Sequence, residues 1–541
     1  MSFALAALIG IVAWGLGGYA PWATLVLQVA CVALTGWLVT SVLFSTNREA
    51  RERNVTIARS QRRFSLFGFG GKRRTSEVEI LAPDDPVDPD AKPTAARSTP
   101  DGAGSFYVLG YPFRRTGVGM LTLAITLWMV LSLVPLWASW LAVVSPKAFA
   151  LRNEIAALMS DDPVASAPWS VTPFLSYQDV LLWIAYLMLF WVTYHVASSS
   201  RAIRRLSVGL VVVGIASGAY GLVQWLSLLG ATLGEGGPSG GLMATGTFGN
   251  RNHYAFFQEM VLLVSLGWLL CRWSEAESRE RDRVVRQEAH ARNALLALGV
   301  ACIALSLLFS LSRSGITFAL AGSAAFFVLY RASRNPSEAR ASSNFTPLVV
   351  VLGISLIATA VWIGIDPVVS RFELVPQELR VGEEGRAAVW RDSLAAVEDF
   401  WLTGSGLSSF QYVFPSYRSF GGRRFYSWAH NDYLQIAIEL GLPGLLLTAL
   451  IIAWIVRRAL KIRVLLKGQP AWGHLHAGYC AAALAVALHS FTDFGLHLPA
   501  NAALFAILAG VVTGFSPEPH ASRRRKTIRR KKLRRSAPVY A

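Results

Sequence analysis

Long runs of apolar residues, each followed by a polar segment, recur from one end of the chain to the other. A helix needs about 20 mainly apolar residues to cross the hydrocarbon core of a bilayer. The pattern therefore predicts an all-α polytopic membrane protein with about twelve transmembrane helices. The predicted spans are 3–17, 22–44, 118–143, 178–197, 206–229, 254–271, 293–311, 315–331, 346–365, 440–456, 475–491 and 498–514.

Two long polar segments and a basic C-terminal strip divide this series of spans. Loops longer than about 12–15 residues are usually functional or disordered, so each long segment is a candidate for one of these roles. The predicted organisation is two spans in 1–46, a polar insertion in 47–117, a transmembrane core with short outer loops in 118–365, a large polar loop with short helices in 366–439, three last spans in 440–514 and a tail in 515–541.

The insertion begins basic and then becomes acidic and rich in proline. Such a composition cannot bury a hydrophobic core, so we expect 47–117 to be disordered. It holds Asp88 and Asp90 in the Asp-x-Asp spacing of metal-dependent glycosyltransferases, a match that we attribute to chance in a proline-rich linker. The polybasic tail is typical of a segment that binds anionic lipid head groups, and a protein or nucleic-acid partner is the alternative.

Composition and charge indicate the class of protein and its orientation. The chain is 53% hydrophobic and 16% charged, which argues against a soluble enzyme. Lys and Arg accumulate in the cytoplasmic segments of membrane proteins, and with both termini inside, 40 of the 51 fall there. The net charge of +18 is then mostly a consequence of topology, so we expect membrane lipids and no nucleic acid as partners. The 366–439 loop lies on the outer side in this arrangement.

The sequence shows no metal or disulfide framework. Its four cysteines, Cys31, Cys271, Cys302 and Cys480, fall in or at the ends of apolar spans and have no Cys-x-x-Cys spacing. The outer segments hold no group of residues with clear metal-ligand spacing. We therefore predict no metal and no cofactor.

A His-Asn-Asp triplet stands where the large outer loop meets the next apolar run, in HNDYLQIAIELGLPG. Asp432 and Gln435 have capping-box spacing, and Gly441 and Pro443 are expected to end the helix that follows. His430 then lies just before a helix N-terminus, where the positive end of the dipole disfavours an imidazolium and attracts a phosphate. This position makes His430 a candidate general base beside an anion, and a solvated histidine in an interfacial cap is the alternative.

Two further segments place cations at the same outer boundary. Arg313 lies between two spans in Ser-Arg-Ser-Gly, where a cation without an acidic neighbour is expensive unless an anion binds. Arg251 and Asn252 follow a glycine-rich loop and open a helix, a setting whose backbone amides can hold an anion. For both arginines, the alternative is an interfacial anchor whose charge extends to water.

Taken together, these motifs resemble the O-antigen ligase family, which includes polysaccharide polymerases and protein-glycosylating oligosaccharyltransferases of the cell envelope. The resemblance covers about 120–514. The matching positions are His430, Asn431, Gly441 and Gly444 for the family's His-Asn and Gly-x-x-Gly signature, Ser312, Arg313 and Gly315 for Ser-Arg-x-Gly, 246–252 for Gly-Thr-x-Gly-Asn-x-Asn, Arg386, Trp390, Gly404, Gly406 and Phe410 for the outer-loop motif, and 489–502 for the last outer turn.

The resemblance implies an enzyme of the bacterial inner membrane that transfers a glycan from undecaprenyl diphosphate to an acceptor hydroxyl, with inversion and without a metal. His430 would accept the proton, and fixed cations would stabilise the leaving diphosphate. Many relatives carry an arginine just before the Gly-Thr-x-Gly segment, which this chain lacks. The expected substrate-binding residues are Arg313, Arg251, Arg386, Asn431, Asn252 and Asp493, the last beside His489 and His497. For Asn431, a role as a helix cap is the alternative.

The acceptor stays open at this stage. A lipid A core sugar would make the enzyme a ligase in lipopolysaccharide assembly, a second repeat unit would make it a polymerase, and protein is a third acceptor. A polytopic transporter without enzymatic activity is the rival class, since twelve spans with both ends inside is also a carrier layout. Carriers place ionisable groups near the bilayer midplane, whereas here they gather at the outer boundary.

Overall fold

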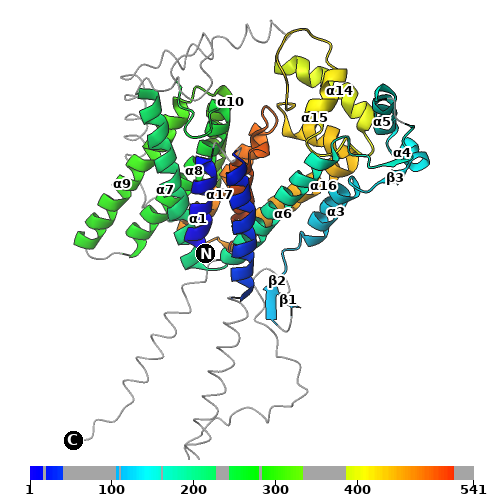
Figure 1. Cartoon of the computed structure of the whole chain (residues 1–541). Helices are drawn as coiled ribbons and strands as arrows, with labels where there is room; N and C mark the ends of the chain where they lie inside the picture. Colours follow the sequence, from blue (N-terminus) through cyan, green and yellow to red (C-terminus); the bar gives the residue numbers. More distant parts are fainter. Residues whose placement is uncertain are drawn as a thin grey trace, which may run out of the picture. The chain divides into compact units, whose positions relative to one another are not determined.

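The structure is a computed structural model that describes residues 1–15, 20–40, 105–108, 111–159, 162–226, 243–279, 283–332 and 385–516 (Figure 1). The chain forms two compact units. The first combines Met1–Val32 with Val118–Ala541, and the second is Ala33–Gly117. The candidate site lies entirely in the first unit.

Within the described residues, seven helices are long and apolar enough to cross a membrane. This confirms an all-α membrane protein, while the count of twelve spans and the cytoplasmic termini stay predictions. The predicted span 346–365 lies outside the described residues. The seven are Pro21–Thr40, α6 (Pro173–Val196), α7 (Ser200–Leu226), α8 (Arg251–Arg279), α9 (Arg283–Leu308), α10 (Arg313–Ala332) and α16 (Asp432–Leu465). Four shorter or less apolar helices accompany them, namely α1 (Ser2–Trp14), α3 (Gly119–Leu131), α17 (Pro470–His489) and α18 (Pro499–Gly514).

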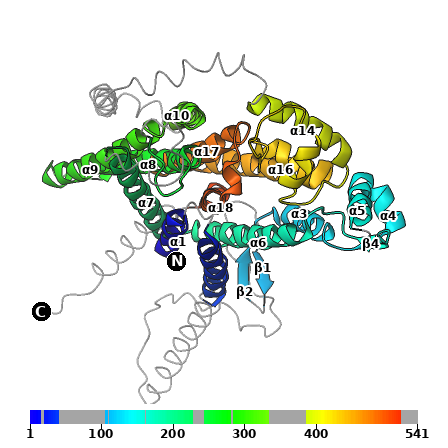
Figure 2. The ribbon, with the colours of Figure 1, turned by 45° about the horizontal axis from the view of Figure 1, so that its top comes forward.

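Helix α8 is the most enclosed helix of these spans, since 94% of its most apolar stretch is buried. It packs against α7, α9, α10 and α17, and Figures 1 and 2 show it beside α17. Glycines allow the closest approach, because a Cβ atom at Gly478 would lie 2.8 Å from the Cα atom of Gly267 and 2.6 Å from the carbonyl oxygen of Leu263. The backbones of α8 and α17 are therefore in direct contact.

Helix α16 bends near its start. Gly441 has φ 63° and ψ −168°, a conformation suited to glycine, and it separates a first segment from the long apolar part. The freed backbone groups find partners, since Leu442 N–H donates to the Trp401 carbonyl and the Leu440 carbonyl accepts from Trp128 Nε1 at 2.9 Å. The sequence prediction that Gly441 and Pro443 interrupt the helix is confirmed, although apolar residues continue it beyond the bend.

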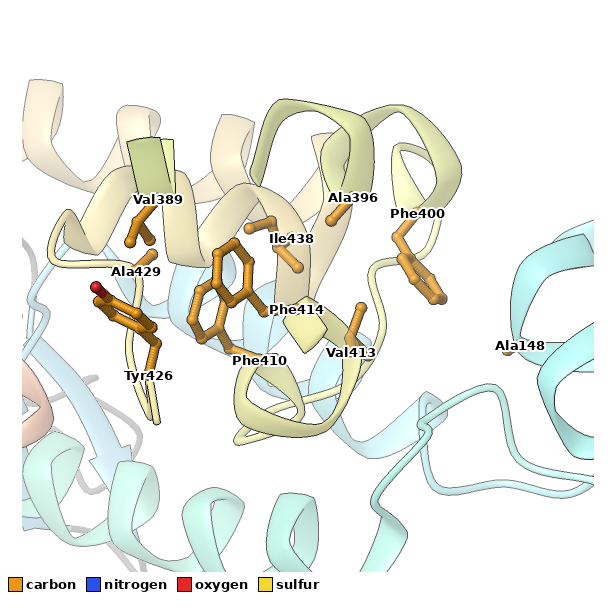
Figure 3. Packing of buried hydrophobic residues seen from close by; sticks show 10 residues of the cluster. All are labelled: Ala148, Val389, Ala396, Phe400, Phe410, Val413, Phe414, Tyr426, Ala429 and Ile438. Atoms are coloured by element: carbon orange, nitrogen blue, oxygen red, sulfur yellow. The ribbon is translucent and has the colours of Figure 1, made fainter. Parts of the chain in front are cut away.

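The described part of the large loop, from Gly385 on, contains α14 (Arg386–Phe400), α15 (Phe410–Val413) and the 3-10 helix η3 (Phe414–Ser416). Their buried side chains form one cluster with Ile438 of α16 and Ala148, and Figure 3 shows the rings of Phe410 and Phe414 side by side near Ile438. Ala148 belongs to α5 (Pro146–Leu158), which follows α4 (Ala138–Val144). The short paired strands β3 (Leu136–Trp137) and β4 (Ser166–Ala167) lie before and after these two helices. The loop is thus packed onto the start of α16.

The second unit holds an unexpected element. Strands β1 (Ser105–Val108) and β2 (Tyr111–Arg114) form an antiparallel hairpin at the end of the insertion for which the composition predicts disorder. Aromatic and β-branched residues at these positions favour strands. They make up a small part of the insertion, so its overall composition does not indicate a hairpin. Residues 47–104, with Asp88 and Asp90, lie outside the described residues.

Replacing Gly478 by Ala is expected to lower the thermal unfolding midpoint of the detergent-solubilised protein by several degrees. The added methyl group would meet backbone atoms of α8 that cannot move aside, and overpacking of this kind costs about 1–3 kcal/mol. Gly119→Ala is the matched control, because a Cβ atom there has nothing within 4 Å. Equal midpoints for both variants would contradict the close packing of α8 and α17.

Candidate active site

His430 occupies a strained position directly before α16. Its φ of 53° lies in the left-handed region, which costs a non-glycine residue about 1–2 kcal/mol. The neighbouring residue Asn431 is the N-cap, and its Oδ1 accepts from the backbone N–H groups of Tyr433 at 3.0 Å and Leu434 at 3.1 Å. The capping role expected as the alternative for Asn431 is therefore confirmed, whereas the capping-box spacing of Asp432 places the cap one residue too late. Gln435 instead bridges back over the histidine by accepting from Ala429 N–H at 2.9 Å.

Helix α14 holds the other side of the His430 backbone. Trp390 Nε1 donates to the carbonyl of Ala429 at 3.0 Å and approaches that of His430 at 3.3 Å. The imidazole packs edge-on against Phe494, with 4.9 Å between ring centroids. Three separate segments therefore fix this histidine, which is how the surrounding structure maintains an unfavourable backbone conformation.

The imidazole also faces a buried carboxylate. His430 Nδ1 lies 3.4 Å from Asp493 Oδ1, and Arg386 Nη2 donates to Asp493 Oδ2 at 3.0 Å. Arg386 also donates to the carbonyl of Thr492. The Asp493 side chain is 2% exposed and that of His430 27%, so the carboxylate lies beneath the histidine. The structure thus brings together His430, Arg386 and Asp493, three of the residues that the sequence selects.

The charge state of Asp493 follows from its partners. Burial by itself would raise its pKa, but the Arg386 guanidinium and the neighbouring imidazole of His430 outweigh burial and hold the pKa well below its usual range. The group therefore remains a carboxylate. A carboxylate beside Nδ1 favours the tautomer with its proton on Nδ1, which leaves Nε2 as the atom that can accept a proton.

Residues 298–449 match the family model described as O-Antigen ligase. This match supports the O-antigen ligase family. The matched stretch contains Arg313, Arg386 and His430, whereas Asp493 lies beyond it. None of the curated proteins matches the chain. The resemblance found in the sequence is therefore confirmed, and it indicates a multi-pass bacterial membrane protein of the glycosyl-transferring ligase or polymerase type.

The histidines that flank Asp493 in sequence have other partners. His489 Nδ1 lies 3.0 Å from Glu259 Oε2, and both side chains are fully buried. His497 Nδ1 lies 2.9 Å from Asp432 Oδ1. Sequence reasoning missed Glu259, although a single carboxylate inside an apolar span is a recognised signal of function or pairing.

The starts of α8 and α10 lie together. A Cβ atom at Gly315 would be 2.4 Å from that of Ala255, so the first turn of α10 packs on the first turns of α8. The ring of His253 is 4.7 Å from Phe494, the side chain that also touches His430. Arg313 and Arg251 are the first residues of these two helices. The starts of α8 and α10 are therefore neighbours, and Phe494 lies between the start of α8 and His430.

The other expected binding residues have smaller local roles. Asn250 Oδ1 accepts from the backbone N–H of Asn252 at 2.8 Å and so begins α8, and the Arg251 guanidinium approaches the Met243 sulfur at 3.8 Å. The side chain of Asn431 is occupied as a cap. In the described part of the chain, no three or more His, Cys, Asp or Glu residues are grouped as metal ligands.

The His497 and Asp432 pair predicts a pH dependence of stability. Burial would lower the pKa of His497, but the hydrogen bond and charge of Asp432, with the charges of Glu439 and Asp179, raise it above its ordinary value. A raised pKa stabilises the fold fully below the unfolded value of about 6.5, and this contribution disappears as the pH rises through the folded value. We expect the unfolding midpoint of the natural protein to exceed that of His497→Gln at pH 6, and the difference to shrink by pH 9. A constant difference would show that the pair is not ionic.

Proposed function

We propose that this protein transfers a glycan from undecaprenyl diphosphate to a hydroxyl group of the lipid A core on the periplasmic face, with inversion and without a metal ion. The observation that carries the proposal is His430, held in a strained conformation before α16 and beside the buried Asp493, within the matched O-antigen ligase domain. Strain that is maintained by several contacts is a feature of functional sites.

In the proposed reaction, the acceptor oxygen attacks the anomeric carbon of the donor as the bond from that carbon to the phosphate oxygen breaks. The hydroxyl proton passes to Nε2 of His430, and undecaprenyl diphosphate leaves with the bonding electron pair. The Asp493 carboxylate, which stays ionised, stabilises the imidazolium that forms. A single displacement inverts the configuration, because the acceptor approaches opposite the leaving group.

Cations stabilise the diphosphate in this scheme. Arg313 is our first choice because it opens α10, which packs on the start of α8, and Arg251 and Asn252 open α8 itself. Two helix N-termini add backbone N–H groups and positive dipole ends for a diphosphate. Arg386 is engaged by Asp493 and Thr492, so we assign it a supporting role in fixing the carboxylate. Asn431 contributes by defining the start of α16.

The decisive experiment compares the natural protein with His430→Ala in detergent. The assay combines undecaprenyl-diphosphate-linked glycan from the native host, lipid A core as acceptor and a chelator. We expect kcat to fall by about 10²- to 10⁴-fold, the usual contribution of a general base, with the unfolding midpoint retained. His290→Ala is the matched control, because this histidine of α9 packs at a tilted angle on Trp273 of α8 and belongs to no part of the site. Undiminished transfer by His430→Ala would refute the proposal.

The pattern of products identifies the acceptor. A single glycosylated band indicates a ligase, whereas a ladder of products would identify a polymerase. If neither lipid A core nor a second glycan is ever modified while a glycan crosses proteoliposome membranes, the protein is a transporter instead. Loss of product in the presence of chelator would contradict the metal-independent step.

Asp493→Asn tests the positioning of the base. The amide keeps the shape of the side chain but removes the negative charge, so we expect kcat to fall while the acceptor KM changes little. Measurement of both constants by the same assay checks this expectation. A rise in KM with an unchanged kcat would mean that Asp493 binds the acceptor rather than supporting His430.

A further inference from the structure

The loop that leads from η3 toward His430 exposes two arginines. We call residues 418–425 the arginine loop. Arg423 and Arg424 lie on its surface beside Phe425, whose side chain is 64% exposed. Within the described part of the chain, no hydrogen bond or ion pair engages either guanidinium group. Two neighbouring cations beside an exposed aromatic ring are a surface suited to an external anion.

The arginine loop is held in one shape from inside. The guanidinium of Arg418 lies 4.7 Å from the ring centroid of Phe420 and 5.4 Å from that of Tyr426. The same guanidinium group donates hydrogen bonds to four backbone carbonyl groups of the loop. It donates to the carbonyl oxygens of Phe420 at 2.9 Å, Gly421 at 2.5 Å, Gly422 at 2.9 Å and Arg424 at 2.9 Å. A loop fixed in this way loses little conformational entropy when a ligand binds.

Helix α14 fixes the base of the loop. Asp392 accepts from the backbone N–H of Ser419 at 2.7 Å and from Arg391 Nε at 3.0 Å. The Asp392 side chain is only 4% exposed, whereas that of Arg391 is 64% exposed. The Asp392 carboxylate therefore lies beneath the surface, whereas Arg391, Arg423 and Arg424 are exposed.

This surface borders the candidate active site. Arg391 follows Trp390 in α14, and Trp390 holds the carbonyls of Ala429 and His430. At the other end of the loop, Tyr426 and Ala429 are buried in the same hydrophobic cluster as Val389 of α14 (Figure 3). Both ends of the arginine loop are thus tied to the residues that position His430.

We propose that Arg391, Arg423, Arg424 and Phe425 form a subsite for an acceptor saccharide that carries phosphate groups. Guanidinium groups bind phosphate through paired, charge-assisted hydrogen bonds, and an exposed aromatic ring packs on the apolar face of a sugar. The inference rests on the proposed function, because it gives the acceptor of that reaction its chemical class. Phosphates of lipid head groups offer the same chemistry, so the experiment separates the two sources.

The test measures acceptor binding and turnover separately. The probes are phosphorylated lipid A core oligosaccharide and the same saccharide after removal of its phosphates. Binding is measured directly to a His430→Ala protein, with and without Arg423→Gln and Arg424→Gln, and kcat and KM are measured in the catalytically intact background. Arg292→Gln is the matched control, because its side chain is 72% exposed and lies in α9.

We expect the double variant to weaken binding of the phosphorylated probe about tenfold, the effect of losing one or two charge-assisted contacts. The acceptor KM should rise by a similar factor while kcat is unchanged. The dephosphorylated probe should bind the double variant and its parent equally, and Arg292→Gln should have no effect. Because binding is measured without turnover, this result can hold even if no transfer is ever observed, so failure of the proposed function remains distinguishable.

Two outcomes would overturn the subsite. One is equal binding of the phosphorylated probe with and without the two substitutions. The other is a loss that depends on anionic phospholipid rather than on the acceptor, measured in nanodiscs with neutral lipid and with 30 mol% phosphatidylglycerol. In that second case, the arginine loop binds lipid head groups, and the acceptor is recognised elsewhere.

Discussion

The arrangement of the candidate site depends on one buried carboxylate, that of Asp493, which requires positively charged or hydrogen-bonding partners. Asp493 is almost inaccessible to water, and an ion in such a place is costly unless cations and donors surround it. It obtains Arg386 from α14 and the imidazole of His430 from the start of α16. Because these partners come from different parts of the chain, one electrostatic requirement joins the outer loop, the reactive histidine and the turn after α17.

The turn that carries Asp493 connects this cluster to the membrane helices. The Ser490 carbonyl accepts from Asp432 N–H at 2.8 Å, and the His489 carbonyl accepts from Thr492 N–H at 2.8 Å. His489 in turn pairs with Glu259 inside α8, with the rings of Phe256 and Phe318 close by. The close contact of α8 with α17 therefore determines the position of groups that touch His430, so packing deep in the bundle influences the geometry at the outer surface.

Local sequence patterns were sufficient for part of this arrangement. Apolar runs located most of the helices, and Gly441 with Pro443 located the bend in α16. The sequence does not decide between Asp432 and Asn431 as the cap, because the residue that caps depends on which backbone is extended, and Asn431 has φ −163° and ψ 107°. The contacts of Asp493 with Arg386 and of His489 with Glu259 join residues that are 107 and 230 positions apart. Tertiary packing creates such pairs, and no local period predicts them.

The spacing between His430 and the glycines of the family signature has a physical reason. The helical segment from Asp432 to Leu440 spans about 13 Å, and it ends where Gly441 adopts φ 63°. There the backbone of the outer loop crosses α16 so closely that a Cβ atom at Gly404 would lie 2.2 Å from the Glu439 carbonyl oxygen. Gly406 N–H donates to that carbonyl at 2.9 Å, in place of the helical bond that Pro443, which has no N–H, cannot donate. The glycines therefore allow the loop to pack on α16 at Glu439, one short helical segment away from His430. The length of that segment determines the distance between His430 and the apolar part of α16.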